Sequence, residues 1–259
     1  MKYGACYVLF NEEDYIEKSI DSIYNWADKI YILLGVPFDG VSMDVDKTKE
    51  IVLAYPDKDR KICVMETDET DETICKNYLR GLCVKDSIDY CWIVDGDEVY
   101  DERNMKPLFK MIEKTEPELV KIYCLEYWRS IHHVISMAPH YTFFKADKIP
   151  IRIRSPAITT YNTLRTPNNA PIFHHYGLAK TVDRIRMKYT STRIRERKDT
   201  KFNLEMWLAD KFVAWEKDHT ITDLYPFRKD IWNKTTKAED IYVPEIMKDH
   251  KWYGVDCIK

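Results

Sequence analysis

The sequence YCWIVDGDE occupies residues 90–98 and joins an apolar run to three carboxylates. Tyr90–Val94 is rich in residues that favour β-strands, so we predict a buried strand that ends where the acidic residues begin. Burial of unpaired carboxylates is costly, and a divalent cation would remove their mutual repulsion. Hard oxygen ligands suit Mg²⁺ or Mn²⁺, and a turn at Gly96 could direct Asp95 and Asp97 toward one ion. The alternative interpretation is an ordinary acidic turn after a strand.

Strand and helix patterns alternate on the N-terminal side of this stretch. Strands are predicted at residues 4–10, 29–34 and 62–65, and helices at 46–55 and 73–85. A further helix follows the first strand, because the apolar residues Ile16, Ile20 and Ile23 share one helical face, and Asn11 is its expected N-cap. The alternation predicts an α/β fold with a mostly parallel sheet flanked by helices. Ligands of such sheets bind at the carboxyl ends of the strands.

The second half of the sequence is less regular. Strands are predicted at residues 119–128 and 141–145, and helices at 181–197 and 204–217. We expect the chain after His219, which carries prolines and aromatic residues, to wrap the surface of the domain.

Composition narrows the class of protein. The 259 residues are 45% hydrophobic and 32% charged, which is typical of a globular chain. No apolar run is long enough to span a bilayer. The apolar N-terminus meets Asn11 without a cleavage site, so we interpret it as a strand and expect a cytoplasmic protein. The seven cysteines include no CxxC pair, which favours buried free thiols over a disulfide scaffold or a zinc site.

Charge is divided unevenly along the chain. Residues 1–120 hold 15 Lys and Arg against 27 Asp and Glu, whereas residues 121–259 hold 25 against 16. The stretch Lys180–Lys201 has nine basic and three acidic residues. An acidic half with a carboxylate-rich site and a basic half would suit a metal ion and an anionic substrate. The alternative is a basic helix face that is only solvated.

Four parts of the sequence together resemble family 2 glycosyltransferases, which have the GT-A fold. The resemblance covers roughly residues 4–190, and its parts are Phe10–Glu13 with Trp26–Ile30, Asp46–Ile51, Lys76–Asn77 with Tyr90–Glu98, and His174–Gly177. It implies transfer of a sugar from a nucleotide-diphosphate sugar, expected to be a UDP-sugar, to an acceptor hydroxyl. It also implies inversion and dependence on Mn²⁺ or Mg²⁺. It divides the chain into a catalytic domain (1–178, with donor and metal in 1–100 and the acceptor side in 101–178) and a basic helical extension packed on it (179–259).

The resemblance also assigns roles to particular residues. The metal ligands are expected to be Asp95 and Asp97, completed by His175 or His174. The donor-binding residues are expected to be Asn11, Glu12, Lys76, Asn77, Asp95 and Gly96, with the diphosphate further stabilised by Arg184 and Lys188. The family usually has an Asp that reads the nucleobase at the end of the second strand. Gly35 stands there, so Asp39 is the candidate for base recognition.

An inverting transfer also needs a general base beside the acceptor hydroxyl. The candidates are Glu126, Glu98 and Asp147, and Glu126 is preferred because its apolar neighbours would raise its basicity by desolvation. A surface carboxylate on an exposed strand face is the alternative for Glu126. The stretch Arg154–Ala157 lacks the His-Glu pair of related enzymes and supplies no base.

Two alternatives concern the function and two concern the acceptor. The chain could be a non-catalytic nucleotide-sugar binding module of the same fold. A nucleotidyltransferase is a weaker alternative, because it would need a glycine-rich phosphate loop after the first strand, where Asn11–Asp14 stands. A saccharide, neutral or anionic, is the leading acceptor, and a lipid-linked phosphate at a membrane surface or a nucleic acid with a modified base are the others. The pattern does not predict an oligomeric state.

Overall fold

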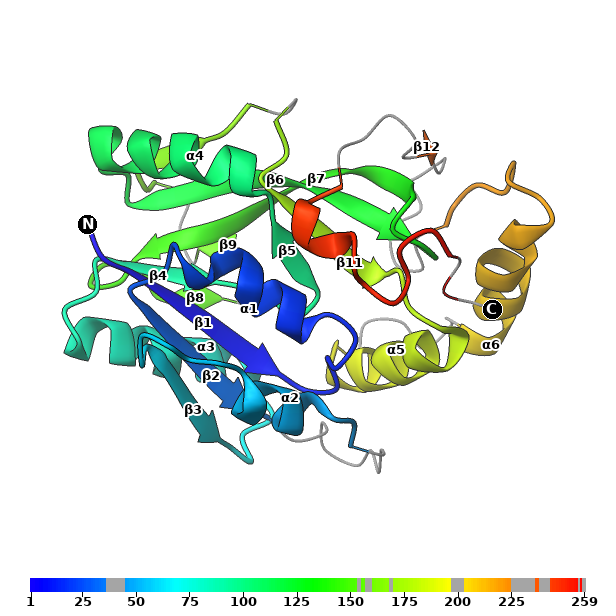
Figure 1. Ribbon diagram of the computed structural model, residues 1–259, viewed down its shortest axis with the longest axis horizontal. Helices are drawn as coiled ribbons and strands as arrows, with labels where there is room; N and C mark the ends of the chain where they lie inside the picture. The colour runs from blue at the N-terminus through cyan, green and yellow to red at the C-terminus, as the bar shows by residue number, and fades with distance from the viewer. Residues whose placement is uncertain are drawn as a thin grey trace. The chain divides into compact units, whose positions relative to one another are not determined.

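The computed structural model describes residues 1–35, 45–152, 155–156, 160–167, 170–196, 203–224, 236–237, 243–255 and 257 (Figure 1). Side chains are described for these residues except 136, 152, 155–156, 191–196 and 236–237. The chain divides into two compact units, which we describe separately. The first comprises Met1–Val36, Asp44–Cys124 and Ala138–His174, and the second includes Leu125–Met137 and His175–Lys259.

The first unit is built on a sheet with the strand order β3-β2-β1-β4-β7-β6-β11-β5, and β10 pairs with β6. Its strands are β1 (Tyr3–Leu9), β2 (Lys29–Leu34), β3 (Ile62–Glu66), β4 (Tyr90–Ile93), β5 (Glu98–Tyr100), β6 (Leu119–Trp128), β7 (His133–Lys145), β10 (Thr163–Arg165) and β11 (Phe173–Leu178). The strands β6, β7 and β11 continue into the second unit. A small separate sheet pairs β8 (Ile151–Arg152) with β9 (Ser155–Pro156). Strands β1 to β4 pair in parallel and β7 is antiparallel to β4, which confirms the expected α/β fold with a mostly parallel sheet.

Helices cover both faces of this sheet because its strands alternate their side chains. The helices are α1 (Ile16–Tyr24), α2 (Thr48–Ala54), α3 (Glu72–Lys85) and α4 (Glu102–Thr115). Tyr7 of β1 points to a core shared with α1, α2 and α4, whereas Cys6 points to a core shared with α3. The parallel order and the crossovers leave the carboxyl ends of β1, β2 and β4 on one edge of the sheet (Figure 1).

Two sequence expectations about the first unit are wrong. Asn11 does not cap α1, because α1 begins at Ile16 after Tyr15, whose side chain makes no capping bond. Asn11 instead adopts a left-handed backbone (φ 55°), and its side chain accepts a hydrogen bond from the Asp46 amide (3.0 Å). Helix α4 was not expected. It begins after Asp101, whose side chain accepts a bond from the Arg103 amide (2.9 Å), and it contains Pro107.

The second unit contains α5 (Val182–Glu196), α6 (Leu204–Trp207), a π-helical turn (Leu208–Val213), 3-10 turns at Ala214–Glu216 and Glu245–Met247, and β12 (Thr236–Lys237). The single helix expected at 204–217 is therefore three short helical segments of different pitch. The C-terminal segment is tied to the turn between β6 and β7, because the Cys257 amide donates to the Arg129 carbonyl (3.0 Å). The Gly254 amide likewise donates to Nε2 of His132 (2.9 Å).

Two further expectations concern the whole chain. The seven cysteines are free, as expected, but Cys63 is exposed rather than buried. The proposed domain boundary at residue 178 stays a prediction. Within the described part of the chain, no helix has the length and apolar character needed to cross a membrane.

Candidate active site

The acidic residues after β4 form a tight turn that leads into β5. The Glu98 amide donates to the Asp95 carbonyl (3.1 Å), which closes the turn around Gly96. The Asp95 amide in turn donates a hydrogen bond to the side chain of Glu98, at Oε2 (3.2 Å). The Tyr100 hydroxyl donates to the same oxygen (3.4 Å). Asp97 and Glu98 are buried, at 1% and 0% exposure, and Asp95 is half-buried. Glu98 thus helps to hold the turn in shape, and its role as a general base stays a prediction.

Gly96 lies where the loop after β1 contacts this turn. A Cβ atom on Gly96 would lie 2.7 Å from the Cβ and 2.8 Å from the Cγ of Glu12, and 2.9 Å from Cδ2 of Leu9. Real Cβ atoms do not approach other atoms so closely, so only glycine fits here. The fold therefore brings Glu12 to Asp95–Asp97, as expected from the carboxyl ends of neighbouring parallel strands.

The loop after β1 is held by the start of α2. The Glu12 amide donates to the hydroxyl of Thr48 (2.7 Å), and the Glu13 amide donates to Oδ2 of Asp46 (3.1 Å). Together with the bond between Asn11 and Asp46, these contacts fix the backbone from which Glu12 projects. Residues of the stretch Asp46–Ile51 thus position the loop that carries Glu12. In the sequence, only the family resemblance indicated that this stretch belongs to the site.

Lys76 and Asn77, expected to bind the donor, make contacts within the first unit. The Asn77 amide nitrogen donates to the Ile151 carbonyl (2.6 Å), and its oxygen accepts from the Ile151 amide (3.0 Å). Asn77 therefore connects α3 to β8. Lys76 is buried at 2% exposure and forms an ion pair with Glu72. Donor binding by these two residues stays a prediction.

His174 is buried at 1% exposure, and its Nε2 lies 3.8 Å from Oδ2 of Asp101. Burial lowers the pKa of His174, and Asp101 only partly opposes this effect. Burial also opposes ionisation of Asp101, but the nearby His174 and the hydrogen bonds from Arg103 outweigh it and lower the pKa of Asp101 to about 2. The contact of His174 is thus with the N-cap of α4, and metal binding by His174 stays a prediction.

In the second unit, His175 pairs with Glu126. Nδ1 of His175 donates to Oε2 of Glu126 across 2.6 Å; Glu126 is 8% exposed and His175 is half-buried. A carboxylate on Nδ1 fixes the tautomer and leaves the lone pair on Nε2, which is the arrangement of a metal ligand or a base. The alternative of an exposed surface carboxylate at Glu126 is wrong. This pairing joins residues 49 positions apart, and no sequence signal indicated it.

Gly177 and Lys188 of α5 lie close to this imidazole. A Cβ atom on Gly177 would lie 2.8 Å from Nε2 of His175 and 3.2 Å from Nζ of Lys188. The imidazole and the ammonium group therefore both pack closely against Gly177. Arg184 lies one turn before Lys188, and both are half-buried.

Several basic side chains of the stretch Lys180–Lys201 are less available to bind an anionic ligand than the sequence suggested. Lys180 is buried at 3% exposure, and the Arg186 guanidinium is paired with Glu205 (2.7 Å) and Asp183 (2.6 Å). The side chains of Arg193 and Arg195 and the whole of residues 197–202 lie outside the described residues, as does Asp39. Sequence reasoning also missed Arg129, which is fully buried and donates to the Phe212 carbonyl (3.0 Å).

Comparisons with solved structures give low similarity. S. aureus TarS has a TM-score of 0.42 and 11% identity, over 74% of this chain and 40% of that chain. A shorter form, TarS 1-349 in complex with UDP, has a TM-score of 0.41 and 10% identity, over 85% and 78% of the two chains. A 4-diphosphocytidyl-2C-methyl-D-erythritol synthase has a TM-score of 0.36 and 11% identity, over 56% and 74%. The chain thus spans two-fifths of the length of the first TarS chain.

Sequence comparison is more informative. No curated protein matches this sequence. The model of glycosyl transferase family 2, in contrast, matches residues 6–175, which include the end of β1, the acidic turn, His174 and His175. This match covers well over half of the 259 residues. The chain therefore belongs to glycosyl transferase family 2.

Proposed function

We propose that this chain transfers a sugar from a nucleotide-diphosphate sugar to an acceptor hydroxyl, with inversion and with the help of a divalent metal ion. The observation that supports the proposal most directly is the turn Asp95–Glu98. It stands at the carboxyl end of β4, it buries the side chain of Asp97, and it packs against Glu12 through a position where only glycine fits. The turn lies within the residues that match the family.

The residues of this turn suit a hard divalent cation. Asp95 and Asp97 would hold Mn²⁺ or Mg²⁺ through carboxylate oxygens, which are the ligands these ions prefer. The bound ion would supply positive charge that neutralises the diphosphate leaving group. The chain's own residues keep the turn rigid: Glu98 accepts from the Asp95 amide, and Ser19 donates to the Asp95 carbonyl (3.3 Å). A ligand pair held in this way needs little rearrangement when charge develops on the donor.

For the general base we propose His175, with Glu126 as the residue that positions it. Glu126 was the preferred base from sequence, but its oxygen accepts the proton of Nδ1 and is already engaged. In this arrangement Nε2 of His175 takes the proton of the acceptor hydroxyl, and the negative charge of Glu126 stabilises the resulting imidazolium. The role expected from the resemblance, His175 as a further metal ligand, uses the same nitrogen. The two roles exclude each other, and metal titration separates them.

The donor we propose is a UDP-sugar, and the acceptor is a saccharide. The positive charge of Lys188, which packs against Gly177, would suit an anionic group of donor or acceptor. An extended polyanion such as nucleic acid is a less favoured acceptor than the sequence alone suggested. Lys180 is buried, and Arg186 forms an ion pair within the chain.

The proposal is tested with the purified chain, a set of nucleotide sugars, and Mn²⁺ or Mg²⁺ present or removed by chelation. Release of nucleoside diphosphate that requires metal supports it. Asp97→Asn should lower this turnover by at least about 100-fold because it removes a ligand charge from the site. Asp210→Asn, an exposed carboxylate in the second unit, is the matched control and should retain full turnover. Nucleotide-sugar binding without turnover in any condition would instead indicate a binding module, and metal-independent turnover in Asp97→Asn would remove the assigned site.

A further inference from the structure

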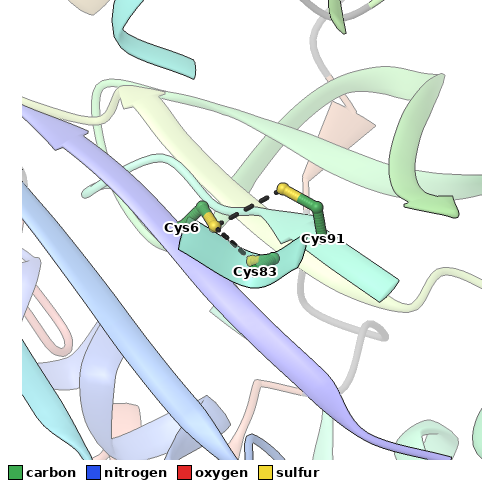
Figure 2. A group of neighbouring side chains, drawn as sticks. All are labelled: Cys6, Cys83 and Cys91. Atoms are coloured by element: carbon green, nitrogen blue, oxygen red, sulfur yellow. Dashed lines mark hydrogen bonds between the residues drawn. The ribbon is translucent and has the colours of Figure 1, made fainter. Parts of the chain in front are cut away.

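The core between α3 and the sheet contains three cysteines that come from distant parts of the sequence. Cys6 lies on β1, Cys83 on α3 and Cys91 on β4, and their side chains point toward one another (Figure 2). The sulfur of Cys6 lies 3.6 Å from that of Cys83 and 3.4 Å from that of Cys91. All three sulfur atoms lie within 4.8 Å of one another, and each residue is at most 1% exposed. We propose that Cys6, Cys83 and Cys91 form a three-sulfur binding site for a soft monovalent metal ion, Cu(I).

The spacing of the sulfur atoms suits a single ion. Metal–thiolate bonds are about 2.3 Å long, so three sulfurs around one ion in a plane would lie roughly 4 Å apart. The two measured separations, 3.4 and 3.6 Å, are shorter than this by a few tenths of an ångström. Glycine at position 4 allows the Cys83 sulfur to pack against the backbone of β1, because a Cβ atom there would lie 2.8 Å from that sulfur. The site therefore needs small side-chain shifts and no change of fold.

The surroundings of the three thiols favour Cu(I) over Zn²⁺. The residues that pack around them are apolar and include Leu79, Ile88 and Ile93. Among the residues that the structure describes, no histidine nitrogen or carboxylate oxygen joins the three sulfurs within 4.8 Å. Structural Zn²⁺ takes four ligands in a tetrahedron. Soft thiolates without a fourth ligand instead suit Cu(I).

The three thiols must lose their protons to bind a metal cation as thiolates. Hydrogen bonds from Cys6 and Cys91 lower the pKa of the Cys83 thiol to about 5, against the effect of burial. Burial raises the pKa of Cys6, and the pKa of Cys91 is also raised well above its usual value. The Arg80 guanidinium, which donates to the Ala146 carbonyl (2.6 Å), only weakly favours the ionised forms of Cys83 and Cys91. Binding of Cu(I) to Cys83 and its neighbours would release the remaining thiol protons to solvent.

The site is separate from the proposed transfer reaction. Cys6 points to the face of the sheet that α3 covers, whereas Tyr7, the next residue, belongs to the core on the opposite face. A bound ion would join β1, α3 and β4 and would stabilise the first unit by mass action. If Cu(I) does not bind, the proposed role of Asp95 and Asp97 as ligands of the divalent metal ion is unaffected.

The test is an anaerobic titration of the reduced full chain with Cu(I) against a chromophoric Cu(I) chelator. All proteins carry Cys63→Ser, which removes the exposed thiol. We expect one Cu(I) per chain and a raised melting temperature. Cys83→Ala should lower the affinity by about 100-fold or more, because even the outer partners of a metal change affinity by roughly 10–100-fold. Cys75→Ala, also buried on α3 but outside the cluster, is the matched control and should bind as the parent does.

X-ray absorption of the Cu(I)-loaded parent protein tests the site without any variant, so the result does not depend on whether Cys83→Ala folds. Three sulfur neighbours at about 2.3 Å would support the site. Fewer than three sulfurs, or oxygen and nitrogen neighbours, would overturn it. Equal Cu(I) affinity in Cys83→Ala and Cys75→Ala, absence of Cu(I) binding in the parent, or tight Zn²⁺ binding in place of Cu(I) would overturn it as well.

Discussion

Gly96 packs against Glu12 so closely that a Cβ atom on Gly96 would lie 2.7 Å from the Cβ of Glu12. The two residues follow β4 and β1, which are neighbouring parallel strands in the sheet. The contact therefore fixes how the acidic turn sits relative to the end of β1. It also explains why a residue without a side chain separates Asp95 from Asp97: any larger residue would displace one of the two loops.

The first prediction follows from this contact. Gly96→Ala should cost about 1–3 kcal/mol of unfolding free energy, the usual range for an overpacked position, and should abolish metal-dependent donor turnover. Gly81→Ala is the matched control, because a Cβ atom at Gly81 meets nothing within 4 Å. Since Gly81 lies within α3, that variant should gain roughly 0.5–1 kcal/mol. Denaturant unfolding and a turnover assay measure both; equal stabilities would mean that the turn tolerates a side chain.

Much of the first unit could be predicted from the sequence because local patterns agree with the fold. The apolar runs at β1, β2 and β4 and the helical face of Ile16, Ile20 and Ile23 correspond to buried positions. Parallel order then follows from the alternation of strands and helices. The strand ends adjoin as expected, which is why Glu12 and Asp95–Asp97 could be assigned to one place.

Contacts between distant residues could not be predicted in the same way. No local sequence pattern links Glu126 to His175. The sequence therefore suggested Glu126 alone as a base and gave no sign that its carboxylate is hydrogen-bonded to the His175 imidazole. The cysteines of β1, α3 and β4 have no metal-ligand spacing in sequence, and only the packing of α3 brings them together. Helix α4 was missed because it contains Pro107 beyond its first turn, where proline removes a backbone hydrogen bond and normally argues against a helix.

The second prediction tests the role of Glu126. Glu126→Gln keeps an oxygen that can accept from Nδ1 of His175 but removes the negative charge, so kcat/KM should fall by roughly 10–100-fold. Without the carboxylate, His175 should protonate at lower pH, so the acidic limb of the pH profile should move to lower pH. Glu113→Gln, an exposed carboxylate on α4, serves as the control. A lower kcat/KM with an unchanged pH profile would assign Glu126 a purely structural role.

The third prediction concerns Asp101 and pH. The pKa of Asp101 in the folded protein is about 2, below its usual value near 4, so its ionised form stabilises the fold above about pH 4. This contribution should be lost as pH falls from about 4 to about 2. Asp101→Asn retains a good N-cap and removes only the charge, so it should cost about 1–2 kcal/mol at pH 7. Urea unfolding of both proteins from neutral to acid pH measures the difference, which should shrink toward pH 2; a difference independent of pH would contradict the lowered pKa.

The last prediction concerns the buried arginine of the second unit. Arg129 is fully buried with a left-handed backbone (φ 58°), and its guanidinium donates to the carbonyls of Phe212 (3.0 Å) and Val213 (3.4 Å). It also lies 3.7 Å from the carboxylate of Glu216 and 5.6 Å from the ring of Trp215. One planar group thus satisfies the main chain of the π-helical turn, stacks near an aromatic ring and has a charged partner.

Lysine cannot reproduce this arrangement, because an ammonium group lacks the planar fork of donors. Arg129→Lys should therefore cost about 2–4 kcal/mol, which is the range for disrupting a buried charged network. The loss should fall on the second unit, so hydrogen exchange should increase at residues 204–216 while β1 and β4 stay protected. Lys211→Arg, which substitutes a half-buried cation of the same turn that bonds the Thr222 carbonyl (2.7 Å), is the control and should leave exchange unchanged. Uniformly faster exchange in both units of Arg129→Lys would show that the chain unfolds as one cooperative body and that Arg129 does not stabilise the second unit alone.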